Sequence, residues 1–330
     1  MRKPLIVSLL TLTLACVPSG EGTGDPVRIK VRAGASFSEV TDSLTAKGVI
    51  TQSRLFRLYG RFTRKTTLVK PGTYELRPAA GFAHVLGKLV SGDVVTARLV
   101  VPEGMVLRDI APRIAAISGV DAESLTVALR DTTLASRFSV PGPGLEGYLY
   151  PATYTVPVEV PADSLISELV RTYKRVWTEE RRARAEEMGL SERQIVTLAS
   201  IIEKEAVQAD EMPLISSVYH NRLRIGMALQ ADPTVQYALG EHRERLLYAD
   251  IERVRNHPYN TYARPGLPPG PIASASERAI DAALNPADTP YLFFVARPDG
   301  THVFTRTLAE HNRARAAIRR EQRAQGSAAR

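Results

Sequence analysis

The residues best suited to chemistry lie at the end of one amphipathic segment, Ser191–Glu205, which closes with the run Glu-Lys-Glu. Its first residues match a capping box, and apolar residues recur at helical spacing from Ile195 to Ile202. On a helical wheel, Glu203 and Glu205 both fall on the borders of this apolar face. Partial burial raises the pKa of a carboxyl group, and a general acid must keep its proton near neutral pH. The wheel therefore offers two candidate acids and does not choose between them, although an ordinary surface helix can end in the same way.

Three further segments combine amides, hydroxyl groups and tyrosine rings, a mixture that suits sugars. Flat aromatic faces cover the apolar side of a pyranose, and amides and carboxylates bond its hydroxyl groups. The segments are Leu145–Tyr154, His220–Tyr237 and Tyr259–Ile272. The residues in them that we predict to hold a glycan are Glu146, Tyr148, Tyr154, Asn221, Gln230, Asp232, Thr234, Asn260 and Tyr262. Each segment alone can equally be structural, because buried tyrosines and Pro-Gly turns are common.

Composition narrows the class of protein. A chain of 330 residues with 44% apolar and 24% charged residues is a folded chain of about two domains. Its net charge of +8 favours an anionic partner: nucleic acid, anionic lipid or an acidic cell-wall polymer. The single cysteine, Cys16, excludes an intramolecular disulfide and a multi-cysteine metal site. The six histidines lack metal-ligand spacing, so we expect no metal and no other cofactor.

Residues 1–16 have the pattern of a targeting segment. Two basic residues precede an apolar run that is shorter than the ~20 residues of a transmembrane helix. Cys16 ends this run as the lipidated cysteine of a bacterial lipobox would, and residues 17–26 follow with the composition of a linker. An uncleaved short membrane anchor and plain secretion are the alternatives. All three export the rest of the chain, which argues against nucleic acid as a partner.

The elements that must position the candidate residues follow two patterns. Residues 27–98 begin with an alternating strand, Val27–Val31, then a glycine and a helix, and this pattern recurs about 70 residues later. Such units predict small α+β modules rather than a doubly wound sheet, although any strand–turn–helix looks similar. Residues 99–312 are richer in helices and loops, with an irregular stretch over 256–272 that contains five prolines. A loop of that length inside a compact domain is usually functional.

The last segment, residues 313–330, is predicted to be an arginine-rich helix and tail. Arg315, Arg319 and Arg323 fall on one face of this helix. A solvated surface helix is the simplest interpretation of this pattern. Contact of the basic face with anionic lipid or glycan is the alternative.

Taken together, the motifs resemble one family. The order LEGYLYPATY, ASIIEKEA, HNRLRIGMALQADPTVQYALG, YNTYARPGLPPGPIA and TPYLFFVARPDGTHVFTRTLAEHN resembles that of endolytic murein transglycosylases of the MltG/YceG-like type, over about residues 27–312. The resemblance implies an α+β fold: a LysM-like module over 27–98, then a mixed α/β catalytic domain over 99–312 with a lysozyme-like active-site helix. It also implies a bacterial inner membrane location, with the chain anchored by its N-terminus and the catalytic domain in the periplasm.

The resemblance implies a substrate and a reaction as well. Peptidoglycan glycan strands would be cut internally at the MurNAc-β-1,4-GlcNAc bond to leave 1,6-anhydro ends, which would terminate nascent strands, and peptidoglycan synthases would be partner proteins. Carried over by motif, the family's catalytic glutamate is Glu203, acting as acid and then as base. The substrate's own C6 hydroxyl would replace the water and second carboxylate of ordinary glycosidases. A hydrolytic muramidase with Glu146 or Asp232 as base, and a non-catalytic peptidoglycan-binding protein, are the alternatives.

Two positions depart from the family pattern. Ala152 stands where an acidic residue is usual, so any role of that carboxylate is absent. The run Ile272–Ser276 (IASAS) replaces Ile-Ala-x-Pro-Gly, and we expect a weaker turn there.

Overall fold

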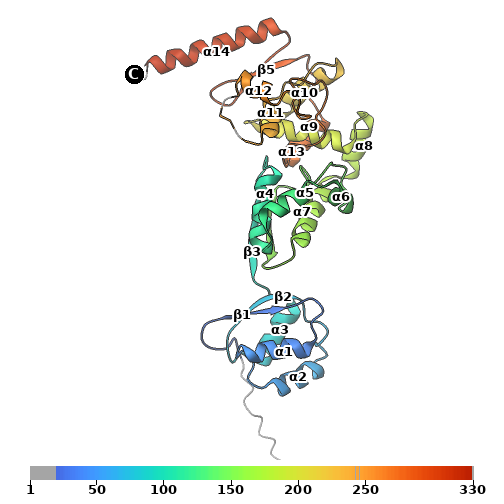
Figure 1. Cartoon of the computed structure of the whole chain (residues 1–330), viewed down its shortest axis with the longest axis vertical. Coiled ribbons are helices and arrows are strands. Elements are labelled where there is room, and N and C mark those ends of the chain that lie inside the picture. Colours follow the sequence, from blue (N-terminus) through green and yellow to red (C-terminus); the bar gives the residue numbers. More distant parts are fainter. Residues whose placement is uncertain (1–19, 242, 245, 329–330) are drawn as a thin grey trace, which may run out of the picture. The chain divides into compact units, whose positions relative to one another are not determined.

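The structure is a computed structural model that describes residues 20–241, 243, 244 and 246–328 (Figure 1). The predicted targeting segment and Cys16 lie outside the described residues. The chain divides into two compact units. Unit 1 comprises the described residues up to Ala97 together with Thr155–Val160, and unit 2 comprises Arg98–Tyr154 and the chain from Pro161 onward.

Unit 1 is a two-stranded antiparallel sheet packed with three helices. Its elements are β1 (Val27–Val31), α1 (Phe37–Ala46), α2 (Ser53–Phe62), β2 (Gly72–Leu76) and α3 (Phe82–Ser91). In the sheet Ile29 lies opposite Tyr74, and both side chains are buried. Phe56 of α2 is fully buried and stacks on the ring of Phe37, with centroids 5.3 Å apart. The predicted strand over Val27–Val31 and the following helix are confirmed.

Two further strands, β3 (Thr96–Val101) and β4 (Ala152–Pro157), pair with each other, and the boundary between the units passes through both. β3 leads into α4 (Leu107–Ser118), so the predicted second strand–glycine–helix pattern is confirmed. Gly34 follows β1 and Gly104 follows β3, with φ of 78° and 68°. Both turns need the left-handed backbone conformation that glycine adopts without strain, which explains the glycine in each pattern.

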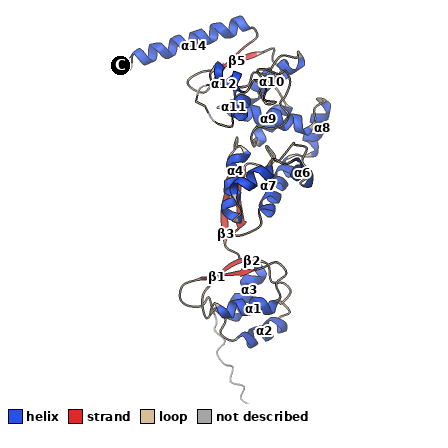
Figure 2. Cartoon of the chain, viewed as in Figure 1, coloured by secondary structure: helices blue, strands red, loops and turns tan. Residues whose placement is uncertain are grey.

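Unit 2 is mostly helical (Figures 1 and 2). After α4 its elements are α5 (Ala122–Leu129), α6 (Thr132–Arg137), α7 (Ala162–Val176), α8 (Glu179–Glu187), α9 (Glu192–Glu205), the 3₁₀ turn η1 (Ala209–Glu211), α10 (Met212–Arg224), α11 (Asp232–Leu239), α12 (Tyr248–Arg253), α13 (Glu277–Leu284), β5 (Phe293–Ala296), β6 (His302–Thr305) and α14 (Leu308–Ala328). β5 and β6 form an antiparallel hairpin, and α14 packs against it. Helices with small two-stranded sheets make the chain α+β, as predicted.

The core of unit 2 is built around α9. Its apolar residues are completely buried between α8, α10, α11 and α13. The predicted capping box is present, because Ser191 Oγ accepts from the backbone N–H of Gln194, whose side chain bonds back to Ser191. The helix ends at Glu205, since Ala206 has an extended backbone with ψ of 122°. Glu205 is therefore the last residue of a helix that the core holds firmly. Among the described residues, no helix is both long and apolar enough to cross a membrane.

Candidate active site

A polar cavity of about 680 Å³ opens in unit 2 beside the end of α9. It is enclosed by α10, the start of α11, the chain around α12, the hairpin β5–β6 and one face of α14. The polar and charged residues that line it are Glu205, Tyr219, Arg222, Gln230, Asp232, Tyr248, Tyr262, His302, His311, Asn312, Arg315 and Arg319. Carboxylates, tyrosines, amides and cations thus converge on one hollow, together with the rings of Phe293 and Phe294.

Glu205 is a carboxyl group of this cavity whose pKa is raised well above its ordinary value. Its Oε1 accepts a hydrogen bond of 2.8 Å from the hydroxyl of Tyr219 on α10. Burial raises the pKa of Glu205 to about 7; the bond from Tyr219 opposes this rise, and the negative charge of Asp232 adds to it. Its place at the carboxyl end of α9 also faces it with the negative end of a helix dipole. Glu205 therefore holds a proton near neutral pH, which is what a general acid requires.

Arg222 supports the cavity floor one helical turn after Tyr219. Its Nε donates to the carbonyl of Leu292 at 2.7 Å, and another guanidinium nitrogen donates to the carbonyl of Leu229 at 2.5 Å. The guanidinium also lies 5.2 Å from the centre of the Phe293 ring. These contacts tie α10 to the hairpin, so the wall that carries Tyr219 is fixed relative to β5.

Three of the nine predicted glycan-binding residues line this cavity with Glu205. Asp232 begins α11, and its Oδ1 accepts a hydrogen bond of 2.5 Å from the hydroxyl of Tyr262. Gln230 precedes it with φ of 49°, and its backbone N–H donates to the carbonyl of Thr261 at 3.1 Å. The segments around Asp232 and Tyr262 thus meet in this cavity.

Glu203 lies elsewhere, at the junction of α9 and α13. Its Oε2 accepts from both the backbone N–H and the hydroxyl of Ser276, at 2.9 and 2.5 Å. Ser276 is the N-cap of α13, because its hydroxyl accepts from the backbone N–H of Ala279. Glu203 is not among the residues that line the cavity of Glu205. The stretch Ile272–Ser276, where we expected a weaker turn, leads into α13 and ends at its N-cap, and the serine that replaces the family's glycine donates to Glu203.

Glu146 lines a different cavity, of about 280 Å³, with Tyr237, Tyr259 and Arg108 among its neighbours. Its Oε1 accepts from the backbone N–H of Leu107 at 2.9 Å. Burial raises the pKa of Glu146 to about 8, while that bond opposes the rise. Since Glu146 does not line the cavity of Glu205, it is not placed to serve as its partner base.

The remaining predicted residues belong to the scaffold. They are Tyr148, Tyr154, Asn221, Thr234 and Asn260, all of them buried. Asn221 and Asn260 each donate two hydrogen bonds to backbone carbonyls, and Thr234 bonds the hydroxyl of Thr261. The ring of Tyr148 packs edge-on against Tyr173. The prediction that these five side chains contact a glycan is not supported, because their surroundings are protein.

Sequence reasoning missed several cavity residues, notably Tyr219, Arg222 and His302. The spacing i, i+3 puts Tyr219 and Arg222 on one face of α10, which a helical wheel of that segment would have shown. The Nδ1 of His302 lies 2.7 Å from Oε2 of Glu211, a pair separated by 91 residues that no local pattern shows. Within the described residues, no group of three or more His, Cys, Asp or Glu side chains is placed to hold a metal ion.

The α+β fold thus carries a polar cavity at the end of α9, in which Glu205, with its pKa raised to about 7, lies beside aromatic, amide and cationic side chains. The chain belongs to the YceG-like family, whose model matches residues 29–317. It is similar to an endolytic murein transglycosylase of Bacillus subtilis, with 35% identity over 306 residues that cover 88% of this chain and 84% of the relative. A second such protein, from Streptococcus pneumoniae, is 28% identical over 87% of this chain and 57% of its own length. The crystal structure of a YceG-like protein from Listeria monocytogenes superposes with a TM-score of 0.61 at 35% identity, over 88% of this chain and all of that one.

Proposed function

We propose that this protein is an endolytic murein transglycosylase, which cuts the bond between N-acetylmuramic acid and N-acetylglucosamine inside peptidoglycan strands. One observation carries the proposal: a carboxyl group with its pKa raised to about 7 closes a cavity lined by aromatic rings, amides and cations. Membership of the YceG-like family and the names of two relatives support it.

We assign the acid to Glu205 rather than to Glu203. Glu205 faces the cavity and is protonated near neutral pH, whereas both hydrogen bonds to Glu203 come from Ser276 outside that cavity. The proton of Glu205 passes to the glycosidic oxygen as the bond from C1 of the muramic acid breaks. The carboxylate then takes the proton of the same sugar's C6 hydroxyl, whose oxygen closes on C1. The product is a 1,6-anhydro sugar, no water is consumed, and one residue serves as acid and base.

Neighbouring groups prepare Glu205 for this exchange. Tyr219 donates to Oε1 and so leaves the other oxygen to face the substrate. An oxocarbenium-like charge develops on the sugar in the transition state. Asp232 lines the same cavity as Glu205 and is our candidate carboxylate to stabilise this charge. Asp232 is also the base that a hydrolytic muramidase would need, which keeps hydrolysis as the competing reaction.

Finer features of the protein rest on the sequence. We propose that unit 1 is a LysM-like module that binds the glycan polymer, and that the catalytic part resembles lysozyme-like enzymes in its active-site helix. We also propose that the N-terminus anchors the protein to the inner membrane, with unit 2 in the periplasm and peptidoglycan synthases as partners. The targeting pattern of residues 1–16 supports the membrane anchor, and the net charge of +8 favours an acidic cell-wall polymer as partner.

Product analysis tests the proposed reaction. Purified uncrosslinked glycan strands are digested with the full chain, and the new ends are identified by mass spectrometry. We expect cuts inside long strands that leave 1,6-anhydro ends. Each such end has the mass of a reducing end less one water molecule. New reducing ends would establish a hydrolase, and intact strands that still bind the protein would establish a binding protein.

A further inference from the structure

We propose that Arg315, Arg319 and Arg323 of α14 form an anion-binding extension of the substrate cleft, which takes the carboxylates of the peptide stems on the glycan. The proposal rests on the proposed function, because it concerns the same substrate. The arginine face takes no part in the cleavage reaction, and we assign to it the binding of a second part of the substrate, the peptide.

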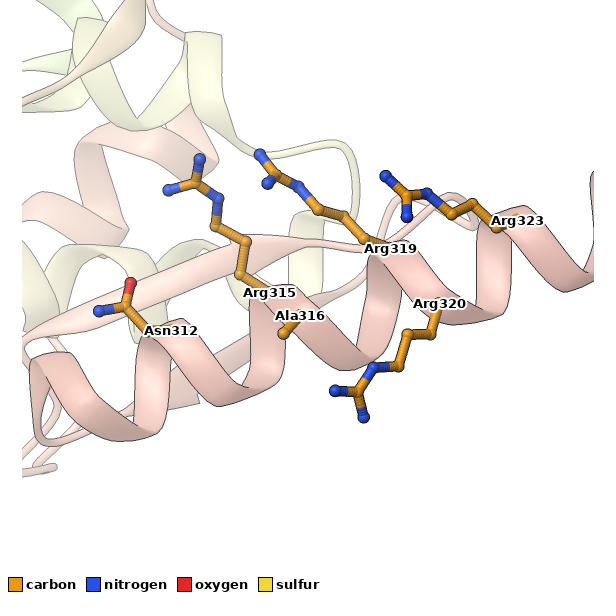
Figure 3. A pocket seen from close by; sticks show the side chains of 6 residues that line it. All are labelled: Asn312, Arg315, Ala316, Arg319, Arg320 and Arg323. Atoms are coloured by element: carbon orange, nitrogen blue, oxygen red, sulfur yellow. The ribbon is translucent and has the colours of Figure 1, made fainter.

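The geometry joins this surface to the catalytic cavity. Asn312, Arg315 and Arg319 line the cavity of Glu205, and the same three residues line an adjoining hollow of about 370 Å³ together with Arg323. Figure 3 shows the side chains of Arg315, Arg319 and Arg323 projecting from one side of α14. At 1.5 Å per residue the row spans roughly 12 Å along the helix. A ligand in the cavity can therefore continue directly along the row of guanidinium groups.

Within the described side chains, the charges of this row lack an ion-pair partner. Among the side chains that the structure describes, no carboxylate lies within ion-pair distance of Arg315, Arg319 or Arg323. Arg181, in contrast, pairs with both Glu277 and Asp281. Like charges at spacing i, i+4 destabilise a helix, so the bare row costs stability that an anionic ligand would restore. The pKa of His311 is lowered by burial and further by the charge of Arg315.

The chemistry of the substrate selects the anion. Neutral sugar rings carry no negative charge that could pair with the guanidinium groups. Each muramic acid, in contrast, carries a lactyl-linked peptide with free carboxylates. The planar guanidinium group binds a carboxylate through two parallel hydrogen bonds, which a neutral amide cannot match. An anionic membrane would also attract these arginines, but it would not need them to share walls with the cavity of Glu205. The continuity of the two hollows therefore favours the peptide stem.

The test compares two forms of one substrate. Peptide-bearing strands are used as isolated, and in parallel after their stem carboxylates have been converted to amides. We expect the wild-type protein to bind and cut the carboxylate form with about tenfold lower Kd and KM, and this preference to shrink in high salt. Arg323→Gln, which lies outside the cavity of Glu205, should lose most of the preference. Arg313→Gln removes the same charge from an exposed position of α14 that lines neither hollow, and it should keep the preference.

The outcomes separate the two proposals. Equal binding of both substrate forms by the wild type, or an unchanged preference in Arg323→Gln, would overturn the anion-binding role even if cutting is normal. An Arg323→Gln protein that keeps the preference but no longer binds phosphatidylglycerol vesicles would assign the row to the membrane instead. Failure to cut either form would refute the proposed reaction, while the measured Kd ratio would still decide the role of the row.

Discussion

At the scale of single residues, the structure separates two glutamates that differ little in sequence. Glu205 meets Tyr219 in a cavity, and Glu203 meets Ser276 at a helix junction. Burial raises the pKa of Glu205 to about 7, so its surroundings rather than its residue type allow it to hold a proton near neutral pH.

The raised pKa of Glu205 predicts the pH dependence of cleavage. Because the acid must be protonated, kcat/KM should fall as pH rises above about 7, with the loss of one proton. The hydrogen bond from Tyr219 lowers the pKa of Glu205, so Tyr219→Phe should move this falling limb to higher pH. A shift of up to about one pH unit corresponds to a bond of ~1 kcal/mol. A limb that moves to lower pH, in a variant whose thermal unfolding is normal, would contradict the assignment.

The sequence predicted what depends on near neighbours. The capping box at Ser191 and the apolar stripe of α9 are local patterns, and both are present. The choice between the glutamates depends on partners 14 and 73 residues away, Tyr219 and Ser276. A helical wheel places both glutamates at the border of the apolar face, but it does not show which residues of other elements pack against them. The family resemblance implied Glu203 because it compares sequence motifs and contains no information on the residues that pack around each glutamate.

At the level of secondary-structure elements, Glu146 and Glu203 both form hydrogen bonds at helix ends. Glu146 accepts from the first backbone N–H of α4, and Glu203 ties the end of α9 to the start of α13. The arginine face of α14 was predicted from its spacing, but its place in the cavity wall depends on how the hairpin β5–β6 directs the helix. Such directions arise from packing between elements, which periodicity does not encode.

Glu146 gives a prediction for stability. Its pKa is raised from an ordinary value near 4.5 to about 8 in the folded state, mainly by burial. Between these pH values the unfolded chain has lost a proton that the folded chain retains. The free energy of unfolding therefore decreases as pH rises, by about 1.4 kcal/mol per pH unit at most. Glu146→Gln removes this dependence. Urea unfolding at pH 5, 6, 7 and 8 should therefore show a smaller decline for the variant than for the wild type, and equal declines would show that Glu146 is ionised in the folded protein.

At the scale of the whole molecule, each unit has a hydrophobic core of its own. Unit 1 packs its helices and sheet around Phe56, whereas unit 2 is organised around α9. The boundary runs through the paired strands β3 and β4, so the chain crosses it more than once. A core substitution in one unit therefore leaves the core of the other unit unchanged.

A core substitution in unit 1 tests this separation with the full chain. Phe56 is completely buried, and Phe56→Ala should cost about 3–5 kcal/mol in the stability of unit 1. We expect weaker binding to insoluble peptidoglycan and little change in kcat on short soluble strands. Limited proteolysis would confirm that the loosened residues lie in unit 1. Loss of cleavage together with an intact unit 2 would show that unit 1 is needed for the reaction.

The assignment of Glu205 as the acid is tested most directly by two matched substitutions, Glu205→Gln and Glu203→Gln. Each replaces a carboxyl group with a nearly isosteric amide that cannot give up a proton and take it back. Cleavage of purified glycan strands is measured for both, with 1,6-anhydro ends counted by mass spectrometry. We expect Glu205→Gln to lose ~10³-fold or more in cleavage rate. We expect Glu203→Gln to keep activity within about tenfold of the wild type, with a loss of about 1–3 kcal/mol in stability at the contact with Ser276. An active Glu205→Gln beside an inactive but folded Glu203→Gln would contradict the assignment.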